Sequence, residues 1–476
     1  MKDIRQAKIV CTIGPASNSE AMISKLAKTG MDVVRLNFSH GTHEQHAQVI
    51  ETVRGVSRRL EKPMSIIADL QGPKIRTGNV QNGGTVKLKS GQYFTLTTQK
   101  VLGDTNRIAT DYPRLPKEVK KGDHILLDDG LIELCVASKT SSDILCEVVN
   151  GGDLGEHKGI NLPGIKLKIP SLTAKDHADL RFSLEHGANY IAVSFVREAA
   201  DVLAARDAAR KMGSDPLIIA KIEKTEALDN LDDILKVADG VMVARGDLGV
   251  EMRPEKVPVA QKRILERAWR MRVPTITATQ MLDSMTRNPR PTRAEASDVA
   301  NAVFDGTGAV MLSNETAMGR YPLEAVAMMD RIVREAETSP RPLPSGDHPE
   351  TLDTAEAIAE SVCNSARDLN LKIIAVFTET GRAARIIAHY RPPCPIIAFS
   401  PVQETRRRLG LLWGAFPRKI SLVKDIDDLA ATAEKRLLEE RLVKKGDIVG
   451  IVAGTPLGVR GTTNLLKLHT IGSGDR

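Results

Sequence analysis

The sequence predicts a closed (β/α)₈ barrel, the TIM-barrel architecture of the α/β class, with an inserted β-barrel lid domain and a second, C-terminal α/β domain. Eight short apolar runs rich in Val and Ile are each followed by a segment with helical spacing of apolar residues. This pattern is typical of parallel strands that are buried on both faces. Eight repeats are the number that closes such a barrel. A doubly wound open sheet is the alternative, but nothing in that fold stops the repeats at eight.

The predicted barrel comprises residues 1–71 and 170–340. Its strands are expected at 8–14, 32–37, 65–70, 190–196, 217–222, 240–245, 274–279 and 308–313. Amphipathic spacing predicts helices between them, among others at 19–29, 42–60, 176–186 and 257–271.

The alternation of strand and helix patterns stops at residues 72–169. Short strand patterns alternate there with turns such as Gly83-Gly84 and Asn150-Gly151-Gly152. They predict an inserted β-barrel domain that leaves and rejoins the main barrel at its active end. We expect an insertion at that place to act as a lid that excludes water.

A Pro-rich linker follows the barrel at 338–346. Beyond it, the chain predicts a doubly wound α/β domain at 350–476. Its strands are expected at 373–378, 395–400, 419–423 and 447–453, with a final antiparallel strand at 465–471.

Composition excludes several classes of protein. The net charge is +7, but aromatic residues make up only 3% and basic residues alternate with acidic ones, which favours small anions over nucleic acid as partners. No apolar run approaches the roughly 18 residues of a membrane span. Five scattered cysteines and a first segment without a signal-like apolar region predict a cytoplasmic protein with reduced thiols.

The most informative side chains follow the fifth and sixth predicted strands. Lys221 and Glu223 are two residues apart in an extended chain and therefore point to the same side. Asp247 follows the next strand, in a loop bracketed by glycines. The two carboxylates are placed to bind one divalent ion, such as Mg²⁺, beside an anionic substrate. Surface carboxylates, a structural Lys221–Glu223 ion pair and a Schiff-base lysine remain the alternatives.

Other strand ends carry groups suited to anions. Arg35 and Arg76 have guanidinium groups that match phosphate oxygens, and Gly246 lets its amide approach a carboxylate because it has no Cβ. In the C-terminal domain, small hydroxyls, a glycine and helix-start amides predict a separate anion site, which a loop at 454–463 is expected to close over. Its residues are Thr378, Thr380, Gly381 and Arg382. An ordinary helix N-cap turn is the alternative for this segment.

Taken in order, one segment per strand, these strand ends resemble the pyruvate kinase family over essentially the whole chain. The matching segments are 35–41, 69–78, 169–176, 220–223, 242–251, 278–285 and 312–317. The resemblance implies transfer of a phosphoryl group from phosphoenolpyruvate to ADP in glycolysis, giving pyruvate and ATP. It also implies Mg²⁺ or Mn²⁺ as cofactor, a phosphorylated allosteric effector at the C-terminal site, and a homotetramer.

The resemblance also implies roles for single residues. Arg35 and Lys221 would bind the transferred phosphoryl group, and Gly246, Asp247 and Thr279 would surround the rest of the substrate. Thr279 would start the proton path to the enolate, with Ser313 and Glu315 extending it. The residues matched to the nucleotide are Asn37, Ser39, His40, Arg76 and Lys175.

The chain departs from the family pattern at a monovalent-cation site. Asn37, Ser39 and Asp69 remain, but Lys74 stands where K⁺-dependent members carry an acid, and Leu70 where they carry Thr. We therefore expect the Lys74 ammonium to replace K⁺, so that K⁺ is not required. Asn314 stands where Gly is usual, and Asp283 where Glu is usual.

Two other functions fit part of the pattern. A metal-dependent lyase acting on phosphoenolpyruvate or pyruvate would need neither the lid nor Arg76 and Lys175. A catalytically silent metabolite-binding regulator would be expected to lack Lys221, Glu223 or Asp247, and all three are present.

Overall fold

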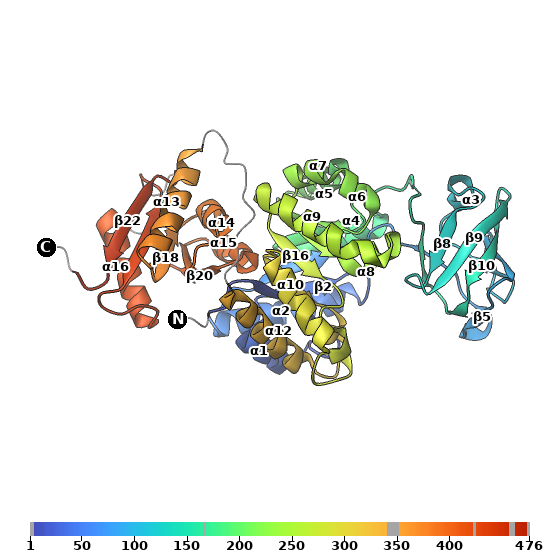
Figure 1. The fold of residues 1–476 in the computed structure, drawn as a ribbon, viewed down its shortest axis with the longest axis horizontal. Helices are drawn as coiled ribbons and strands as arrows, with labels where there is room; N and C mark the ends of the chain where they lie inside the picture. The colour runs from blue at the N-terminus through green and yellow to red at the C-terminus, as the bar shows by residue number, and fades with distance from the viewer. Residues whose placement is uncertain (1–3, 166, 340–351, 422–424, 457–461, 474–476) are drawn as a thin grey trace.

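The computed structural model describes residues 4–165, 167–339, 352–421, 425–456 and 462–473. Three bodies lie in a row, with the barrel in the middle, the insert (residues 72–169) at one end and the C-terminal α/β body at the other (Figure 1). Among the described helices, none combines the length and apolar character that crossing a membrane requires.

Eight parallel strands form a closed barrel in the order β1-β17-β16-β15-β14-β13-β3-β2. Their bounds are β1 (Lys8–Thr12), β2 (Val33–Asn37), β3 (Ser65–Asp69), β13 (Tyr190–Val193), β14 (Leu217–Ile222), β15 (Gly240–Ala244), β16 (Thr275–Ala278) and β17 (Ala309–Leu312). The predicted barrel is confirmed, and most strands are one to three residues shorter than expected, because the site residues after them turn into loops and short helices.

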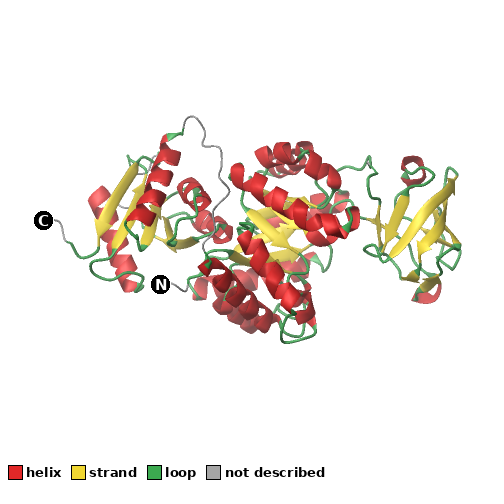
Figure 2. Cartoon of the chain, viewed as in Figure 1, coloured by secondary structure: helices red, strands yellow, loops and turns green. Residues whose placement is uncertain are grey.

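Helices surround the barrel (Figure 2). They are α1 (Glu20–Thr29), α2 (His43–Arg59), α4 (Ala174–Glu185), α5 (Ala199–Lys211), α6 (Thr225–Asp229), α7 (Leu231–Val237), α8 (Arg245–Glu251), α9 (Val257–Arg270), α10 (Arg293–Phe304), α11 (Asn314–Ala317) and α12 (Pro322–Thr338), with short 3₁₀ turns η2 (Pro254–Lys256) and η3 (Asp283–Thr286). The loop predicted around Asp247 was wrong, because these residues form the short helix α8. Two glycines within seven residues hide its helical character in the sequence.

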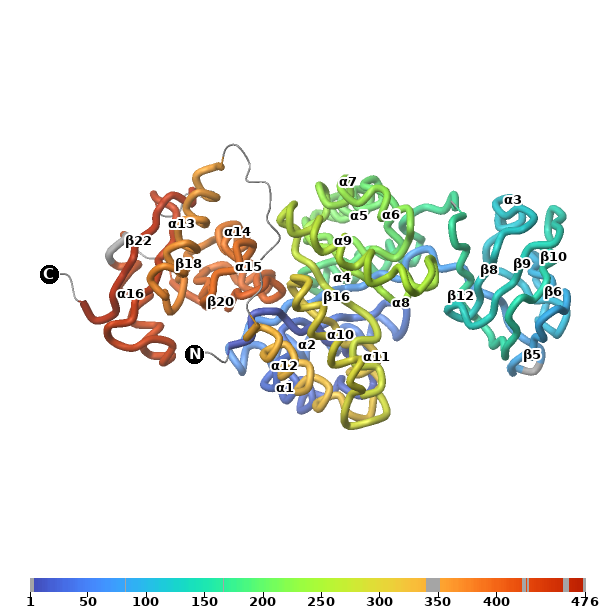
Figure 3. The backbone as a smooth tube through the Cα atoms, in the orientation of Figure 1, coloured from blue at the N-terminus to red at the C-terminus, as the bar shows by residue number. Residues whose placement is uncertain are grey.

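The insert is a curled β-sheet of order β4-β12-β8-β9-β10-β6-β7, beside a two-stranded sheet β11-β5. An isolated bridge between Thr77 and Thr110 joins the two edges of the larger sheet, which closes it like a barrel. The bounds are β4 (Ile75–Arg76), η1 (Gln81–Gly83), β5 (Val86–Leu88), β6 (Tyr93–Thr97), β7 (Arg107–Ala109), α3 (Leu115–Glu118), β8 (His124–Leu127), β9 (Ile132–Lys139), β10 (Asp143–Asn150), β11 (Gly152–Leu154) and β12 (Gly159–Asn161). The outgoing β4 and returning β12 pair antiparallel, and both connections to the barrel lie on the same side of the insert (Figure 3).

The C-terminal body is a five-stranded sheet of order β20-β19-β18-β21-β22, in which β22 is antiparallel, as predicted. Its elements are α13 (Thr354–Asp368), β18 (Ile373–Phe377), α14 (Arg382–His389), β19 (Ile396–Ser400), α15 (Gln403–Arg408), η4 (Leu409–Leu411), β20 (Ala415–Lys419), α16 (Ile426–Glu439), β21 (Ile448–Ala453) and β22 (Leu465–Thr470). The strand expected at 419–423 was wrong, because β20 lies earlier and residues 422–424 fall outside the described chain. Pro417 obscures this strand, and an edge strand tolerates a proline.

The C-terminal body closes the floor of the barrel. Leu411 of η4 packs among the inward-facing barrel side chains, including Tyr190 and Ile219. Around it, Lys8 Nζ donates to the Ala415 carbonyl oxygen at 2.7 Å and Tyr190 Oη to that of Arg408 at 2.6 Å. The barrel interior is therefore completed by residues from the other end of the chain.

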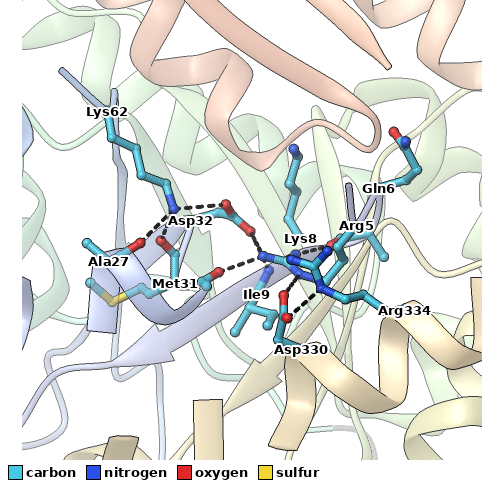
Figure 4. Close-up of polar contacts among 12 residues, drawn as sticks. Arg5, Gln6, Lys8, Ile9, Ala27, Met31, Asp32, Lys62, Asp330 and Arg334 are labelled. Carbon is cyan, nitrogen blue, oxygen red and sulfur yellow. Dashed lines mark hydrogen bonds and ion pairs between the residues drawn. The ribbon is translucent and has the colours of Figure 1, made fainter. Parts of the chain in front are cut away.

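A buried group of charges lies beside this floor (Figure 4). The Arg5 guanidinium lies between Asp32 and Asp330, 2.8 Å from an oxygen of each, and Lys62 Nζ is 3.4 Å from Asp32. The positive charges of Arg5, Lys62 and Lys8 hold the pKa of Asp32 below its usual value, against the burial that alone would raise it. These pairs fix the amino-terminal segment onto the barrel, ahead of β1.

Candidate active site

A cleft of about 2090 Å³ opens at the carboxyl ends of the barrel strands and extends to the insert. The predicted site residues that line it are Arg35, Asn37, His40, Lys74, Gly246, Asp247, Thr279 and Ser313. Lys221, Glu223 and Asp69 are more deeply buried beside these residues. The structure therefore brings the predicted substrate-binding residues together at one place.

Lys221 is the central cation of this site. Its Nζ lies 2.8 Å from Glu223 Oε1 and 3.1 Å from Asp69 Oδ1, and it donates to Ser194 Oγ at 2.7 Å. Burial alone would lower the pKa of Lys221, but the charges of Asp69 and Glu223 raise it above its usual value. The side chain is therefore an ammonium ion, which argues against a Schiff-base lysine, since that chemistry requires a neutral amine.

Arg35 is fixed on the neighbouring strand β2. Its Nε donates to Asp69 Oδ2 at 2.7 Å and its Nη1 to Thr12 Oγ1 at 3.0 Å. Asp69 is 1% exposed and bonds both Arg35 and Lys221. Although burial alone would raise the pKa of Asp69, the charges of Lys221 and Arg35 lower it. One ionised carboxylate thus aligns Arg35, which lines the cleft, with the more deeply buried Lys221.

Glu223 and Asp247 are the two carboxylates of the candidate metal site. Glu223 Oε2 accepts a hydrogen bond from the Phe195 amide at 2.6 Å. Burial and the nearby charge of Asp247 raise the pKa of Glu223, and Lys221 opposes this rise. Within the described part of the chain, no group of three or more His, Cys, Asp or Glu side chains is arranged around a metal position. An ion here would complete its shell with substrate oxygens and water.

A strained turn follows β16. Thr279 and Gln280 have φ angles of +70° and +54°, a conformation that is rare for residues with a side chain and most unusual for β-branched Thr. The Gly246 amide donates to Thr279 Oγ1 at 2.7 Å. Arg245 Nη2 donates to the Thr279 carbonyl oxygen at 2.7 Å, and its Nη1 bonds Asp298 at 2.6 Å.

Sequence reasoning missed this support role of Arg245. The residue type Thr does not indicate a positive φ. The sequence therefore does not show that this turn is strained or that Arg245 stabilises it. Gly246 and Thr279 nevertheless lie together, as predicted.

Ser313 lies at the cleft, and its Oγ is buried without a hydrogen-bond partner among the described residues. Glu315 is turned toward the backbone, because it accepts from the amides of Ser313 at 2.7 Å and Leu282 at 3.1 Å. Burial raises the pKa of Glu315. The Ser313 hydroxyl therefore keeps both its donor and its acceptor capacity for a group in the cleft.

The residues matched to the nucleotide fall into separate places. Asn37 Oδ1 accepts from the Ser39 amide at 3.2 Å, and His40 lies beside them on the same loop. Lys175 Nζ instead bonds Asp179 Oδ2 and the Phe38 carbonyl oxygen, both at 2.6 Å.

Arg76 is the fifth of these residues and belongs to the insert, where its Nη1 donates to the His157 carbonyl oxygen at 3.0 Å. Partial burial lowers the pKa of His40, and the charges of Arg76, Arg35 and Lys74 add to this effect. Three positive charges are therefore gathered around His40, which suits the binding of phosphates.

Lys74 has different neighbours from those predicted. Its Nζ lies 3.9 Å from Asp129 and 4.0 Å from Asp247, and the described contacts do not include Asn37, Ser39 or Asp69. The ammonium is thus at the cleft, near the predicted metal ligand Asp247, while Asp69 is bonded to Arg35 and Lys221.

The predicted effector residues form the turn between β18 and α14. Gly381 has a φ of +86°, and its amide donates to Thr378 Oγ1 at 2.9 Å. The Arg382 amide donates to Thr380 Oγ1 at 3.4 Å, and its guanidinium pairs with Asp353. Part of the second loop, residues 457–461, lies outside the described residues.

The chain is similar to known proteins over nearly its whole length. Residues 4–326 match the barrel domain of pyruvate kinase, and residues 356–469 match its alpha/beta domain. The chain is 48% identical to pyruvate kinase of Staphylococcus saprophyticus and 46% identical to that of Staphylococcus aureus, over 98% of this chain and 81% of each relative. The crystal structure of a pyruvate kinase from Cryptosporidium parvum superposes with a TM-score of 0.92 at 38% identity, covering 98% of this chain and 96% of that one. The chain therefore belongs to the pyruvate kinase family.

Proposed function

We propose that this chain transfers the phosphoryl group of phosphoenolpyruvate to ADP, giving pyruvate and ATP in glycolysis. The observation that carries the proposal is the pair of cations, Arg35 and Lys221, aligned by Asp69 at the cleft. Phosphoryl transfer needs charge neutralisation and alignment more than covalent chemistry. A pre-aligned guanidinium and ammonium meet that need.

We assign the substrate groups as follows. Arg35 binds the phosphoryl oxygens, and Lys221 stabilises charge on the transferred group and on the enolate oxygen. The substrate carboxylate binds beside the Gly246 amide, which bonds Thr279 Oγ1 in its absence. Thr279 supplies the hydroxyl from which the proton path to the enolate starts, and Ser313 Oγ extends it.

The donor set fits Mg²⁺ or Mn²⁺. Glu223 is buried with a raised pKa that Asp247 helps to raise, so a divalent cation between them would relieve their repulsion. Two carboxylates with room for substrate oxygens and water are the ligands that Mg²⁺ prefers. Bound there, the ion would neutralise charge on the phosphoryl group and help to orient the substrate.

We further propose that the nucleotide phosphates are bound by Arg76 and Lys175, next to the loop that contains Asn37, Ser39 and His40. The three positive charges near His40, those of Arg76, Arg35 and Lys74, support this assignment. We also propose that Lys74 makes K⁺ unnecessary. The Lys74 ammonium would do so by bringing positive charge near Asp247, and not by occupying the position beside Asn37, Ser39 and Asp69.

We propose the domain limits 1–71 with 170–340, 72–169 and 350–476, with the insert acting as a lid and the last domain binding a phosphorylated effector at Thr378, Thr380, Gly381 and Arg382. The positive-φ turn at Gly381 supports an anion site, because its amides lie at the start of α14. A homotetramer in the cytoplasm is part of the same proposal.

A coupled assay of pyruvate formation tests the main proposal. Pyruvate and ATP should form only when both ADP and Mg²⁺ are present, and Lys221→Met should lower kcat by about 10²-fold or more. Pyruvate formed without ADP would favour a lyase, and no turnover of either kind would favour a silent regulator. Sugar phosphates and AMP added to the assay test the effector site.

A further inference from the structure

Glu251 is a buried carboxylate at the last position of α8, the helix that begins with Arg245, Gly246 and Asp247. It is 4% exposed. Its Oε1 accepts hydrogen bonds from Lys224 Nζ at 2.6 Å and from Asn161 Nδ2 at 3.2 Å. Its Oε2 is buried and has no hydrogen-bond partner among the described residues.

The two partners of Glu251 belong to elements that matter for the site. Lys224 directly follows Glu223, so the ion pair ties the end of α8 to the segment that carries the other metal-site carboxylate. Asn161 belongs to β12, the strand by which the chain returns from the insert. One carboxylate therefore joins three segments that are far apart in sequence.

The ion pair is well placed to fix geometry. The Lys224 and Glu251 side chains are 11% and 1% exposed, so neither partner is free to exchange its bond for bulk water. Breaking such a pair leaves an uncompensated buried charge, which is much more costly than losing an exposed pair. Because α8 is only seven residues long, a constraint at Glu251 also constrains Asp247, one turn away.

Other contacts show that α8 is one of the places where the insert touches the barrel. Lys74 lies 4.0 Å from Asp247. A Cβ placed on Gly130, in the turn between β8 and β9, would lie 3.7 Å from Val250 Cγ1. The Asn161–Glu251 hydrogen bond is thus one of several contacts by which the position of the insert is transmitted to α8.

We propose that Glu251 is a positioning residue that sets the separation of Glu223 and Asp247 through its ion pair with Lys224. The insert is tied to the same carboxylate through Asn161, so the position of β12 and the geometry of the metal site depend on each other. This inference rests on the proposed function, because it assigns Glu223 and Asp247 to a divalent ion. It predicts that Glu251 affects ion affinity although it does not itself bind the ion.

The test measures Mn²⁺ affinity of the full chain by electron paramagnetic resonance, without substrates. Glu251→Gln removes the charge and Glu251→Asp shortens the side chain by one methylene, so both should weaken Mn²⁺ binding, Glu251→Gln by about tenfold or more. Glu337→Gln is the matched control, because Glu337 is also a largely buried carboxylate and accepts from the Gln6 and Ala7 amides near the floor of the barrel. It should leave the affinity for Mn²⁺ unchanged. Circular dichroism confirms that each variant is folded, and Glu251→Asp keeps the test decisive where Glu251→Gln does not fold.

A double-mutant cycle separates positioning from general damage. Lys224→Met should weaken Mn²⁺ binding, and the Lys224→Met/Glu251→Gln pair should be much less than additive, because both changes break one interaction. Additive losses, or Mn²⁺ affinities equal to wild type in both Glu251 variants, would overturn the inference. That result leaves the proposed function standing if the wild-type chain still forms pyruvate from phosphoenolpyruvate and ADP. If the wild-type chain forms no pyruvate but the Glu251 and Lys224 variants still weaken Mn²⁺ binding as expected, the proposed function fails and the positioning role of Glu251 stands.

Discussion

Thr12 Oγ1 accepts a hydrogen bond from Arg35 Nη1 at 3.0 Å, across the neighbouring strands β1 and β2. The same hydroxyl donates to the Leu312 carbonyl oxygen at 3.0 Å, on the other neighbour of β1. The hydroxyl therefore joins three adjacent strands at the mouth of the barrel. It directs Arg35 toward the cleft, while Asp69 holds the Nε side of the same guanidinium.

Replacing Thr12 by Val tests this arrangement with little change in shape. We expect kcat/KM for phosphoenolpyruvate to fall about tenfold, the equivalent of one lost hydrogen bond to a charged group, with KM for ADP nearly unchanged. Steady-state kinetics with each substrate varied in turn measures both values. Thr277→Val is the control, because Thr277 makes a buried hydroxyl bond to Thr307 away from the cleft. Equal losses in the two variants would contradict a role in orienting Arg35.

Asp179 determines where Lys175 lies, and it also bonds His43 Nε2 at 2.7 Å. We expect Asp179→Asn to raise KM for ADP severalfold and to leave KM for phosphoenolpyruvate nearly unchanged, because Lys175 is assigned to the nucleotide phosphates. The matched control is Asp201→Asn, which breaks a similar i,i+4 pair between Asp201 on α5 and Arg197, just before that helix. An equal rise in KM for phosphoenolpyruvate would show that Asp179 supports the barrel as a whole.

The Lys74 ammonium predicts full activity without K⁺. In tetramethylammonium buffer, the wild-type chain should keep its kcat within about twofold when K⁺ is added, whereas Lys74→Glu should lose most of its activity and regain part of it with K⁺. Replacing the ammonium by a carboxylate puts another negative charge near Asp129 and Asp247, which a cation is then needed to balance. A strong K⁺ requirement in the wild-type chain would contradict the prediction.

Lys8 predicts a pH dependence of stability. Burial lowers the pKa of the Lys8 ammonium to about 7, whereas an unfolded lysine keeps its proton up to about pH 10.4. Between these values the unfolded chain binds more protons than the folded chain, so the free energy of unfolding rises with pH in that range.

Lys8→Met should remove this slope. The free energy of unfolding of the wild-type chain, relative to Lys8→Met, should rise by up to about 4 kcal/mol between pH 7 and pH 10. Urea unfolding followed by circular dichroism at several pH values measures it. Parallel pH profiles for the two proteins would show that Lys8 does not titrate in this range.

Much of the architecture could be predicted because a strand that is buried on both faces is a continuous apolar run in the sequence. The runs that became β14 and β15 contain almost only apolar residues, and the polar groups that follow them had to lie at one end of the barrel. The nearness of Lys221 to Glu223 follows from the two-residue period of a strand. The grouping of Gly246 with Thr279 followed from the resemblance, which assigned both to the substrate carboxylate.

The rest depends on contacts that residue type does not reveal. Helix α8 contains two glycines and is tied to Lys224 through Glu251, and the strained Thr279 accepts a hydrogen bond from Arg245. The partners of Lys74 depend on where the insert lies, which no local pattern records. Similarly, Pro417 conceals β20, because only its place at the edge of the sheet makes the proline acceptable.

The packing of Leu411 inside the barrel has a consequence for the order of events during synthesis. All eight barrel strands have been synthesised once translation reaches residue 312, but the side chain that fills the floor is added only when translation reaches residue 411. Until then, apolar side chains such as Ile219 face an open end. A nascent chain between these two lengths therefore exposes an apolar surface that a chaperone would bind. Synthesis of the C-terminal segment ends that exposure.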